Sequence, residues 1–331
     1  MKRLSSLQGA MLRTVGDFIA PGGSRGALLV LIYHRVLDAP DPILSGEPTA
    51  EQFAAQMATV AATCRVLPLG EAVSRLRAGS LPSRAVSITF DDGYANNREL
   101  AAPILKSLGI PATIFVATGF IGRGRMWNDT VIEAVRGAGA RLDLGALGLG
   151  AFELADAASR LRALEAILPK LKYLDPAQRL ERAEAIADIA GIPREASPMM
   201  SERQLRELES FGIEIGAHTV THPILRSIDT EAARREIAAS KDALESITGR
   251  RVSLFAYPNG RPGRDYDASH VGLVKSCGFD AAVSTAWGAC GRAVDTFQIP
   301  RMLPWDASAV KFGARLLRTY REQRPEQLGL V

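Results

Sequence analysis

Two short motifs contain the residue types that could hold a metal ion and move a proton. The first, Thr-Phe-Asp-Asp-Gly-Tyr, closes an apolar stretch and places Asp91 beside Asp92. The second, His-Thr-Val-Thr-His-Pro, contains His218 and His222, two of the four histidines in the chain. Neighbouring side chains of a strand point to opposite faces, so the aspartates can converge only where the strand breaks, and Gly93 supplies a break. One aspartate could then bind a metal with the histidines while the other accepts a proton.

Each motif alone has a plainer explanation. Asp-Asp-Gly is typical of a turn, and an isolated pair of histidines usually has no catalytic role. The threonines and valine at 219–221 disfavour a helix, however, and Pro223 moves His222 away from helical backbone angles. We therefore expect an extended segment that leaves a strand at 213–215 and presents both imidazoles at the rim that the aspartates occupy. Together, the two motifs predict metal-dependent hydrolysis.

With both motifs present, the chain resembles the polysaccharide deacetylases of carbohydrate esterase family four, the NodB-homology family. The resemblance implies a distorted (β/α) barrel with one metal ion, most often zinc. It implies that Asp92, His218 and His222 are the metal ligands. It also implies that Asp91 is the general base, acting on a metal-bound water whose pKa falls toward about 7.

A third stretch, Phe-Ala-Tyr-Pro-Asn-Gly at 255–260, resembles a later motif of the family. Many members have an arginine at its second position, which tethers the base, and a tyrosine at its fifth, whose backbone amide stabilises the oxyanion. This chain has Ala256 and Asn259 at these positions, so the tether is missing, although the Asn259 amide could still serve. We expect Tyr94, Tyr257 and Asn259 on the substrate and oxyanion side of the site.

Amide cleavage also requires an acid for the departing amine. Family members often use a histidine near the end of the domain, but no histidine follows His270. His34 is the leading substitute, because the exopolysaccharide N-deacetylase branch carries a similar Tyr-His pair on its first strand and also lacks the arginine. The alternative is that His34 only orders the first loop. Arg301 could replace the tether to Asp91, or it could be an ordinary surface or loop-anchoring arginine.

The rest of the chain predicts the scaffold for these residues. With 331 residues, 47% of them apolar, it can bury the core of one barrel. Apolar segments alternate with helical patterns, which predicts an α/β fold, a distorted (β/α)7–8 barrel over 27–320 with its site at the carboxyl ends of the strands. The expected strands are 27–33, 65–68, 86–90, 112–117, 213–216, 252–256 and 281–284.

One stretch departs from this alternation. Residues 123–200 predict a helix, a hairpin around 145–149 and two further helices, the last of them over 176–190. We expect this α+β insertion to lie over the active-site mouth, with a packing elaboration that does not touch substrate as the alternative. The barrel would be flanked by an amphipathic segment, 1–26, and a tail, 321–331.

Charge and apolar patterning bear on partners and compartment. The net charge of +4 is dispersed, so we expect no nucleic-acid partner. Residues 1–19 carry basic groups and apolar side chains at helical spacing, and this helix would pack onto the barrel or lie on a membrane surface. Three cysteines without metal-type spacing, and the lack of a cleavable signal or a spanning apolar segment, predict a cytoplasmic protein with membrane association as the alternative.

The motifs and the resemblance together predict a metal-dependent hydrolase. The resemblance alone implies the substrate, namely N-acetyl groups on amino sugars of a polysaccharide, a glycan or a lipid-linked glycan precursor. The cofactor would be a divalent ion, with zinc expected. Two alternatives remain: a hydrolase of another amide or ester, and a carbohydrate-binding protein that kept the metal but lost turnover.

Overall fold

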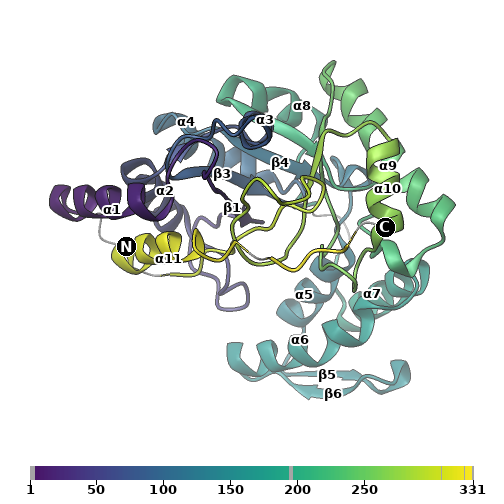
Figure 1. Cartoon of the computed structure of the whole chain (residues 1–331). Helices are drawn as coiled ribbons and strands as arrows, with labels where there is room; N and C mark the ends of the chain where they lie inside the picture. Colours follow the sequence, from purple (N-terminus) through teal and green to yellow (C-terminus); the bar gives the residue numbers. More distant parts are fainter. Residues whose placement is uncertain (1–3, 194–196, 307, 324, 330–331) are drawn as a thin grey trace. The chain divides into compact units, whose positions relative to one another are not determined.

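The computed structural model describes residues 4–193, 197–306, 308–323 and 325–329. A parallel sheet lies at the centre of the first of two compact units, which contains the described residues within 1–39, 46–121 and 200–331 (Figure 1). The strand order is β1-β3-β4-β7-β8-β9, and β2 pairs with the start of β3. Each strand expected from the sequence is present, and the distorted (β/α) barrel is confirmed. The strands are β1 Leu28–Tyr33, β2 Arg65–Val66, β3 Ala85–Phe90, β4 Ala112–Val116, β7 Ile213–Ala217, β8 Leu254–Ala256 and β9 Ala281–Val283.

A short segment that the sequence did not predict joins the two edges of this sheet. Ile299 forms a parallel bridge with Val283 of β9, and Met302 forms one with Leu31 of β1. The Met302 amide donates to the Val30 carbonyl at 2.8 Å. The segment escapes prediction because it is short and contains a proline, which cannot donate to a sheet ladder. It closes the barrel and brings Arg301 between β9 and β1.

Helices cover the outer face of the sheet, and side chains in the sequence cap the start of several of them. Thr49 and Ser201 form capping boxes, and Asp229 caps a long helix that ends before Gly249. Strands β1, β3 and β4 are buried on both faces, as expected for parallel strands between two layers. The helices of this unit are α1 Ser6–Ile19, α2 Ala50–Thr63, α3 Leu69–Ala78, α4 Ala102–Ser107, α8 Glu202–Glu207, α9 Thr230–Thr248, α10 Ala268–Ser276 and α11 Ala309–Thr319.

Residues 40–45 and 122–199 form a second compact unit. It contains the expected hairpin and helices around an apolar cluster of its own. The unit also includes the 40–45 loop, which Arg136 holds through an ion pair with Asp41 at 2.7 Å. Its placement over the active-site mouth stays a prediction. Its elements are α5 Trp127–Gly137, β5 Arg141–Leu144, β6 Gly150–Glu153, α6 Ala157–Lys172 and α7 Pro176–Ala190.

The amino-terminal helix α1 packs beside α11 at the edge of the barrel (Figure 1). Its side toward the barrel includes Gly16, where a Cβ would meet Arg84 and Leu317. Its outer side exposes four large apolar side chains, Leu7, Met11, Val15 and Phe18. Within the described residues, no helix is both long and apolar enough to span a bilayer. Membrane contact and compartment therefore stay predictions.

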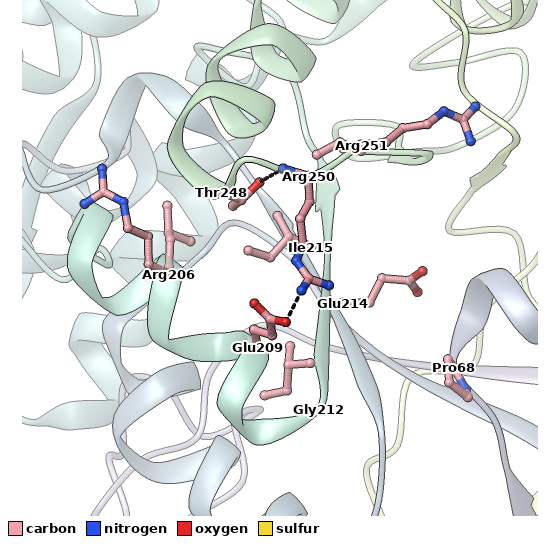
Figure 2. Close-up of a pocket in the computed structure, with 12 residues that line it drawn as sticks. Pro68, Arg206, Glu209, Gly212, Glu214, Ile215, Thr248, Arg250 and Arg251 are labelled. Atoms are coloured by element: carbon pink, nitrogen blue, oxygen red, sulfur yellow. Dashed lines mark hydrogen bonds and ion pairs between the residues drawn. The ribbon is translucent and has the colours of Figure 1, made fainter.

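A cavity of about 760 Å³ lies at the amino ends of the strands, away from the predicted site. Figure 2 shows Glu209 paired with Arg250 at this cavity, and Glu214 beside Ile215 of β7. The Glu214 carboxylate accepts hydrogen bonds from Thr113 Oγ1 at 2.9 Å and from the Gly70 amide at 3.4 Å. Burial nevertheless raises the pKa of this carboxyl above its usual value.

We expect Glu214→Gln to stabilise the protein more at pH 7 than at pH 4. With a raised pKa, folded Glu214 keeps its proton to a higher pH than the unfolded chain does, so its contribution to stability is lost as the pH rises. The glutamine does not titrate and avoids this loss. Urea unfolding of both proteins at the two pH values measures the difference, and an equal difference at both would contradict the prediction.

Candidate active site

The two predicted motifs meet at the carboxyl edge of the sheet. Asp91 follows β3 directly and His218 follows β7, with β4 between these two strands. Backbone hydrogen bonds continue past the strand ends, from the Ala117 amide to the Asp92 carbonyl and from the His218 amide to the Val116 carbonyl. Because the carboxyl ends of parallel strands share one edge, segments far apart in the sequence form one site.

Asp92, His218 and His222 form a set that fits a single metal ion. Asp92 Oδ1 lies 3.5 Å from Nε2 of each histidine, and the three ligand atoms lie within 4.8 Å of one another. Two ligands on a tetrahedral zinc, each about 2.0–2.1 Å from the ion, would be about 3.3–3.4 Å apart. His218 Nδ1 lies 2.7 Å from the Ala256 carbonyl, so it carries the hydrogen and leaves the Nε2 lone pair for an ion.

The backbone turns sharply at two of these three residues. Asp92 has φ 77° and His222 has φ 54°, left-handed values that are unusual outside glycine. The strand therefore breaks at Asp92, one residue before Gly93, where the sequence analysis placed the break. Gly93 is also left-handed, and a Cβ there would lie 3.0 Å from Val116 Cγ1. Residues held in such conformations are typical of functional sites.

Asp91 is held by the arginine on the closing segment. Arg301 Nη1 donates to Asp91 Oδ1 at 2.7 Å, and Nη2 donates to Oδ2 at 2.8 Å. Arg301 is only 1% exposed, and its guanidinium also donates from Nε to the Ser284 carbonyl at 2.8 Å. This two-point contact orients the carboxylate in a plane. Arg301 thus stands where a tether to Asp91 was expected, and a surface arginine does not fit its burial.

The site attracts positive charge. Burial by itself would raise the pKa of Asp91, but the charge of Arg301 and then of His218 lowers it below its usual value. Burial likewise opposes ionisation of Asp92, but hydrogen bonding to His218 and the charge of His222 lower its pKa. Burial would lower the pKa of His218, yet Asp91 and Asp92 raise it. Two ionised carboxylates beside imidazoles favour a cation, either a proton or a metal.

His34 follows β1 and lies at the same edge of the sheet. It is partly buried, and its charge helps to lower the pKa of both Asp91 and Asp92. A residue that the sequence analysis missed, Glu47, lies within electrostatic reach of His34 and Asp92. Glu47 accepts a hydrogen bond from the Arg35 amide at 3.1 Å, and burial raises its pKa. It sits in a loop without a recognisable motif, so no signal in the sequence pointed to it.

The three residues expected on the substrate side have different surroundings in the structure. Tyr257 is fully buried, its hydroxyl donates to the Phe297 carbonyl at 3.1 Å and its amide donates to the Val283 carbonyl. The structure therefore does not support a substrate contact from Tyr257, because both of its donors serve the core. Tyr94 is 2% exposed and lies beneath the Arg35 guanidinium. Asn259 has φ 58°, and its backbone amide has no hydrogen-bond acceptor among the described residues.

Comparison with known proteins decides the family. The model for the polysaccharide deacetylase family matches residues 78–282, more than half of the 331 residues. The chain belongs to the polysaccharide deacetylase family. The matched region contains both aspartates and both histidines of the predicted site, while His34 and Arg301 lie outside it.

Two proteins with sequences similar to this chain are named as deacetylases. A putative polysaccharide deacetylase of Bacillus subtilis, YxkH, is 22% identical over 219 residues, which are 66% of this chain and 51% of the relative. A poly-beta-1,6-N-acetyl-D-glucosamine N-deacetylase of Staphylococcus epidermidis is 33% identical over 123 residues, 33% of this chain and 42% of the relative. The chain therefore spans about half the length of these relatives.

Solved deacetylase structures share the fold. The Streptococcus pyogenes deacetylase PplD, solved with acetate, is 18% identical with a TM-score of 0.60, and the match covers 89% of this chain and 99% of that one. IcaB from Ammonifex degensii is 20% identical with a TM-score of 0.56, and the match covers 89% of this chain and 98% of that one. At these identities the likeness to solved structures establishes the barrel fold alone.

We expect Arg301→Met to lower the free energy of unfolding by about 3–5 kcal/mol, because it leaves a buried carboxylate without its partner. In an Asp91→Asn background the same replacement should cost at least about 1 kcal/mol less, since the charge that Arg301 compensates is gone. Chemical denaturation of the four proteins of this cycle measures the coupling. Equal costs in both backgrounds would show that Arg301 acts through packing alone.

Proposed function

We propose that this polysaccharide deacetylase hydrolyses N-acetyl groups on amino sugars of a glycan. The observation that carries the proposal is the buried Asp91 carboxylate, held at two points by Arg301 and adjacent in sequence to the Asp92, His218 and His222 set. This arrangement separates a proton acceptor from a set of metal ligands. Family membership and the names of the relatives agree with the same reaction class.

The metal would be held by Asp92, His218 and His222. When bound, a divalent ion with three protein ligands would act as a Lewis acid that polarises a carbonyl and lowers the pKa of water toward neutrality. Zinc suits one carboxylate and two imidazoles well, although cobalt, nickel, manganese and iron accept the same donors. The donation from His218 Nδ1 to the Ala256 carbonyl keeps its ring in the tautomer that can bind an ion.

Asp91 would accept the proton of the attacking water. Its two oxygens already accept from Arg301, but a carboxylate has further lone pairs available for water. By lowering the pKa of Asp91, Arg301 weakens it as a base while keeping it ionised and oriented. A general base must be ionised and must also bind the proton strongly. The cations beside Asp91 favour its ionisation but reduce its basicity, and general-base efficiency depends on both.

The remaining two roles are assigned to groups at the same edge. His34 would donate a proton to the departing amine, and Glu47 lies within electrostatic reach of it. The Asn259 amide would donate to the oxyanion that forms from the acetyl carbonyl, because it makes no hydrogen bond within the described structure. A backbone donor requires no particular side chain, so asparagine can stand where other members have tyrosine.

The substrate class is proposed from the relatives. The Staphylococcus epidermidis relative is named for poly-beta-1,6-N-acetyl-D-glucosamine, and 33% identity over a third of this chain makes that polymer the first candidate. Chitin-like oligomers, peptidoglycan fragments and a lipid-linked N-acetyl sugar complete the panel. The α1 side chains Leu7, Met11 and Phe18 make a lipid-linked substrate worth testing, because an exposed apolar face could meet a membrane surface.

Acetate release from this panel tests the function. Metal-stripped protein reconstituted with zinc should release acetate from at least one substrate, and Asp91→Asn should reduce the rate by about 10²–10⁴-fold, the usual contribution of a general base. Zinc stoichiometry of the Asp91→Asn variant is the control for an intact metal set. If no panel member yields acetate despite stoichiometric zinc, the protein is a glycan-binding protein or acts on another amide or ester.

The role of His34 has a test of its own. His34→Gln should slow release from an N-acetyl sugar by about 10²–10⁴-fold, because the amine leaves only when protonated. With 4-nitrophenyl acetate the loss should be far smaller, since nitrophenolate departs without a proton. The ratio of the two losses is therefore the measurement. Equal losses on both substrates would indicate that His34 orders the loop rather than serving as the acid.

A further inference from the structure

The loop between the two histidine ligands is strained. Thr219 has φ 65° and His222 has φ 54°, so residues near both ends of the loop adopt left-handed backbone. For non-glycine residues this conformation costs about 1–3 kcal/mol each and persists only where the surroundings impose it. The contacts around the loop therefore determine where the His222 imidazole points.

A single carboxylate accepts hydrogen bonds from two backbone amides of this loop. Glu236 of α9 accepts hydrogen bonds at Oε2 from the amides of Val220 and Thr221, both at 2.8 Å. Its Oε1 accepts from Thr221 Oγ1 at 2.7 Å. The two amides can only donate, and a carboxylate accepts from both of them and from the Thr221 hydroxyl. A glutamine could keep its oxygen toward the amides only by turning its NH₂ toward the hydroxyl, which can accept but would lose the charge-assisted bond.

The opposite side of the loop is held by the turn after β4. The amides of Thr118 and Gly119 donate to the carbonyls of Thr219 and Val220, at 3.1 and 2.8 Å. A Cβ on Gly119 would lie 2.7 Å from the Val220 carbonyl oxygen, so this close approach requires glycine. The His222 amide donates to Thr219 Oγ1 at 3.2 Å. The turn thus holds the loop carbonyls, and Glu236 holds the two amides that the loop cannot satisfy by itself.

We propose that Glu236 is a positioning residue of the metal centre. By fixing the amides of Val220 and Thr221, its carboxylate sets the loop so that His222 Nε2 faces Asp92 Oδ1. The next residue of α9, Ile237, is fully buried in the core, which makes the helix a rigid support. The inference rests on the proposed metal set but not on the identity of the glycan.

Metal affinity without substrate provides the test. Metal-stripped parent, Glu236→Ala and Glu236→Gln are titrated with zinc by calorimetry and with cobalt by visible absorption. We expect Glu236→Ala to bind about 10–100-fold more weakly, the usual effect of losing a group that orients a metal ligand, and Glu236→Gln to fall between it and the parent. The cobalt absorption bands should shift, because the geometry of His222 changes.

Glu245→Gln is the matched control. Glu245 is on the same helix, and it accepts from the Val252 amide at 2.8 Å and pairs with Lys241. Among the described residues, neither of these partners belongs to the histidine loop. This variant should lose stability without losing metal affinity. If Glu236→Ala does not fold, Thr221→Val, which removes a single donor to Glu236, and Glu236→Gln provide the test.

The possible outcomes are distinguishable. Folded Glu236 variants with parental affinity and parental cobalt spectra would overturn the positioning role and leave the proposed function intact. A parent that binds neither metal would overturn the proposed metal set and, with it, this inference. Weaker binding in the Glu236 variants, unchanged binding in Glu245→Gln and slower acetate release would support both.

Discussion

The buried ion pair between Arg301 and Asp91 is the contact on which the rest of the site depends. It joins the segment that closes the barrel to the end of β3, so barrel closure and the placement of the Asp91 carboxylate depend on the same interaction. A buried carboxylate without a partner is costly, and the two-point contact from a 1% exposed arginine offsets that cost while fixing the plane of the carboxylate. Without it, Asp91 would be a buried acid beside two imidazoles, with no fixed orientation.

The candidate metal ligands are supported by a different kind of contact. His218 is oriented by the Ala256 carbonyl of β8, and the loop that carries His222 is held by the turn after β4 and by Glu236 of α9. Three separate elements therefore converge on two imidazoles. This convergence is available because parallel strands end at one edge, where backbone groups beyond the last sheet hydrogen bonds are free to contact side chains. Strained φ angles at Asp92 and His222 are sustained by those contacts.

The differences between prediction and structure have physical causes. The motif around Tyr257 indicated a substrate contact, but its ring stacks on Tyr266 at 3.9 Å and its hydroxyl is bonded within the core. A motif records residue order along a strand end, not which face each side chain occupies, and here the tyrosine belongs to the buried face. Ala256 was interpreted only as a lost tether, yet its carbonyl orients His218, a backbone role that no side-chain motif can reveal.

By itself, the sequence determined the order of strands and helices, the helix caps and the two motifs, because apolar periodicity, capping chemistry and ligand spacing are local properties of the chain. Tertiary structure alone decided which residues complete the site. Arg301 meets Asp91 across 210 positions, and Glu236 meets the histidine loop from a helix whose pattern resembles any amphipathic surface helix. Glu47 likewise has no motif. Such pairings depend on barrel closure and on loop geometry, which arise only when distant strands share one edge.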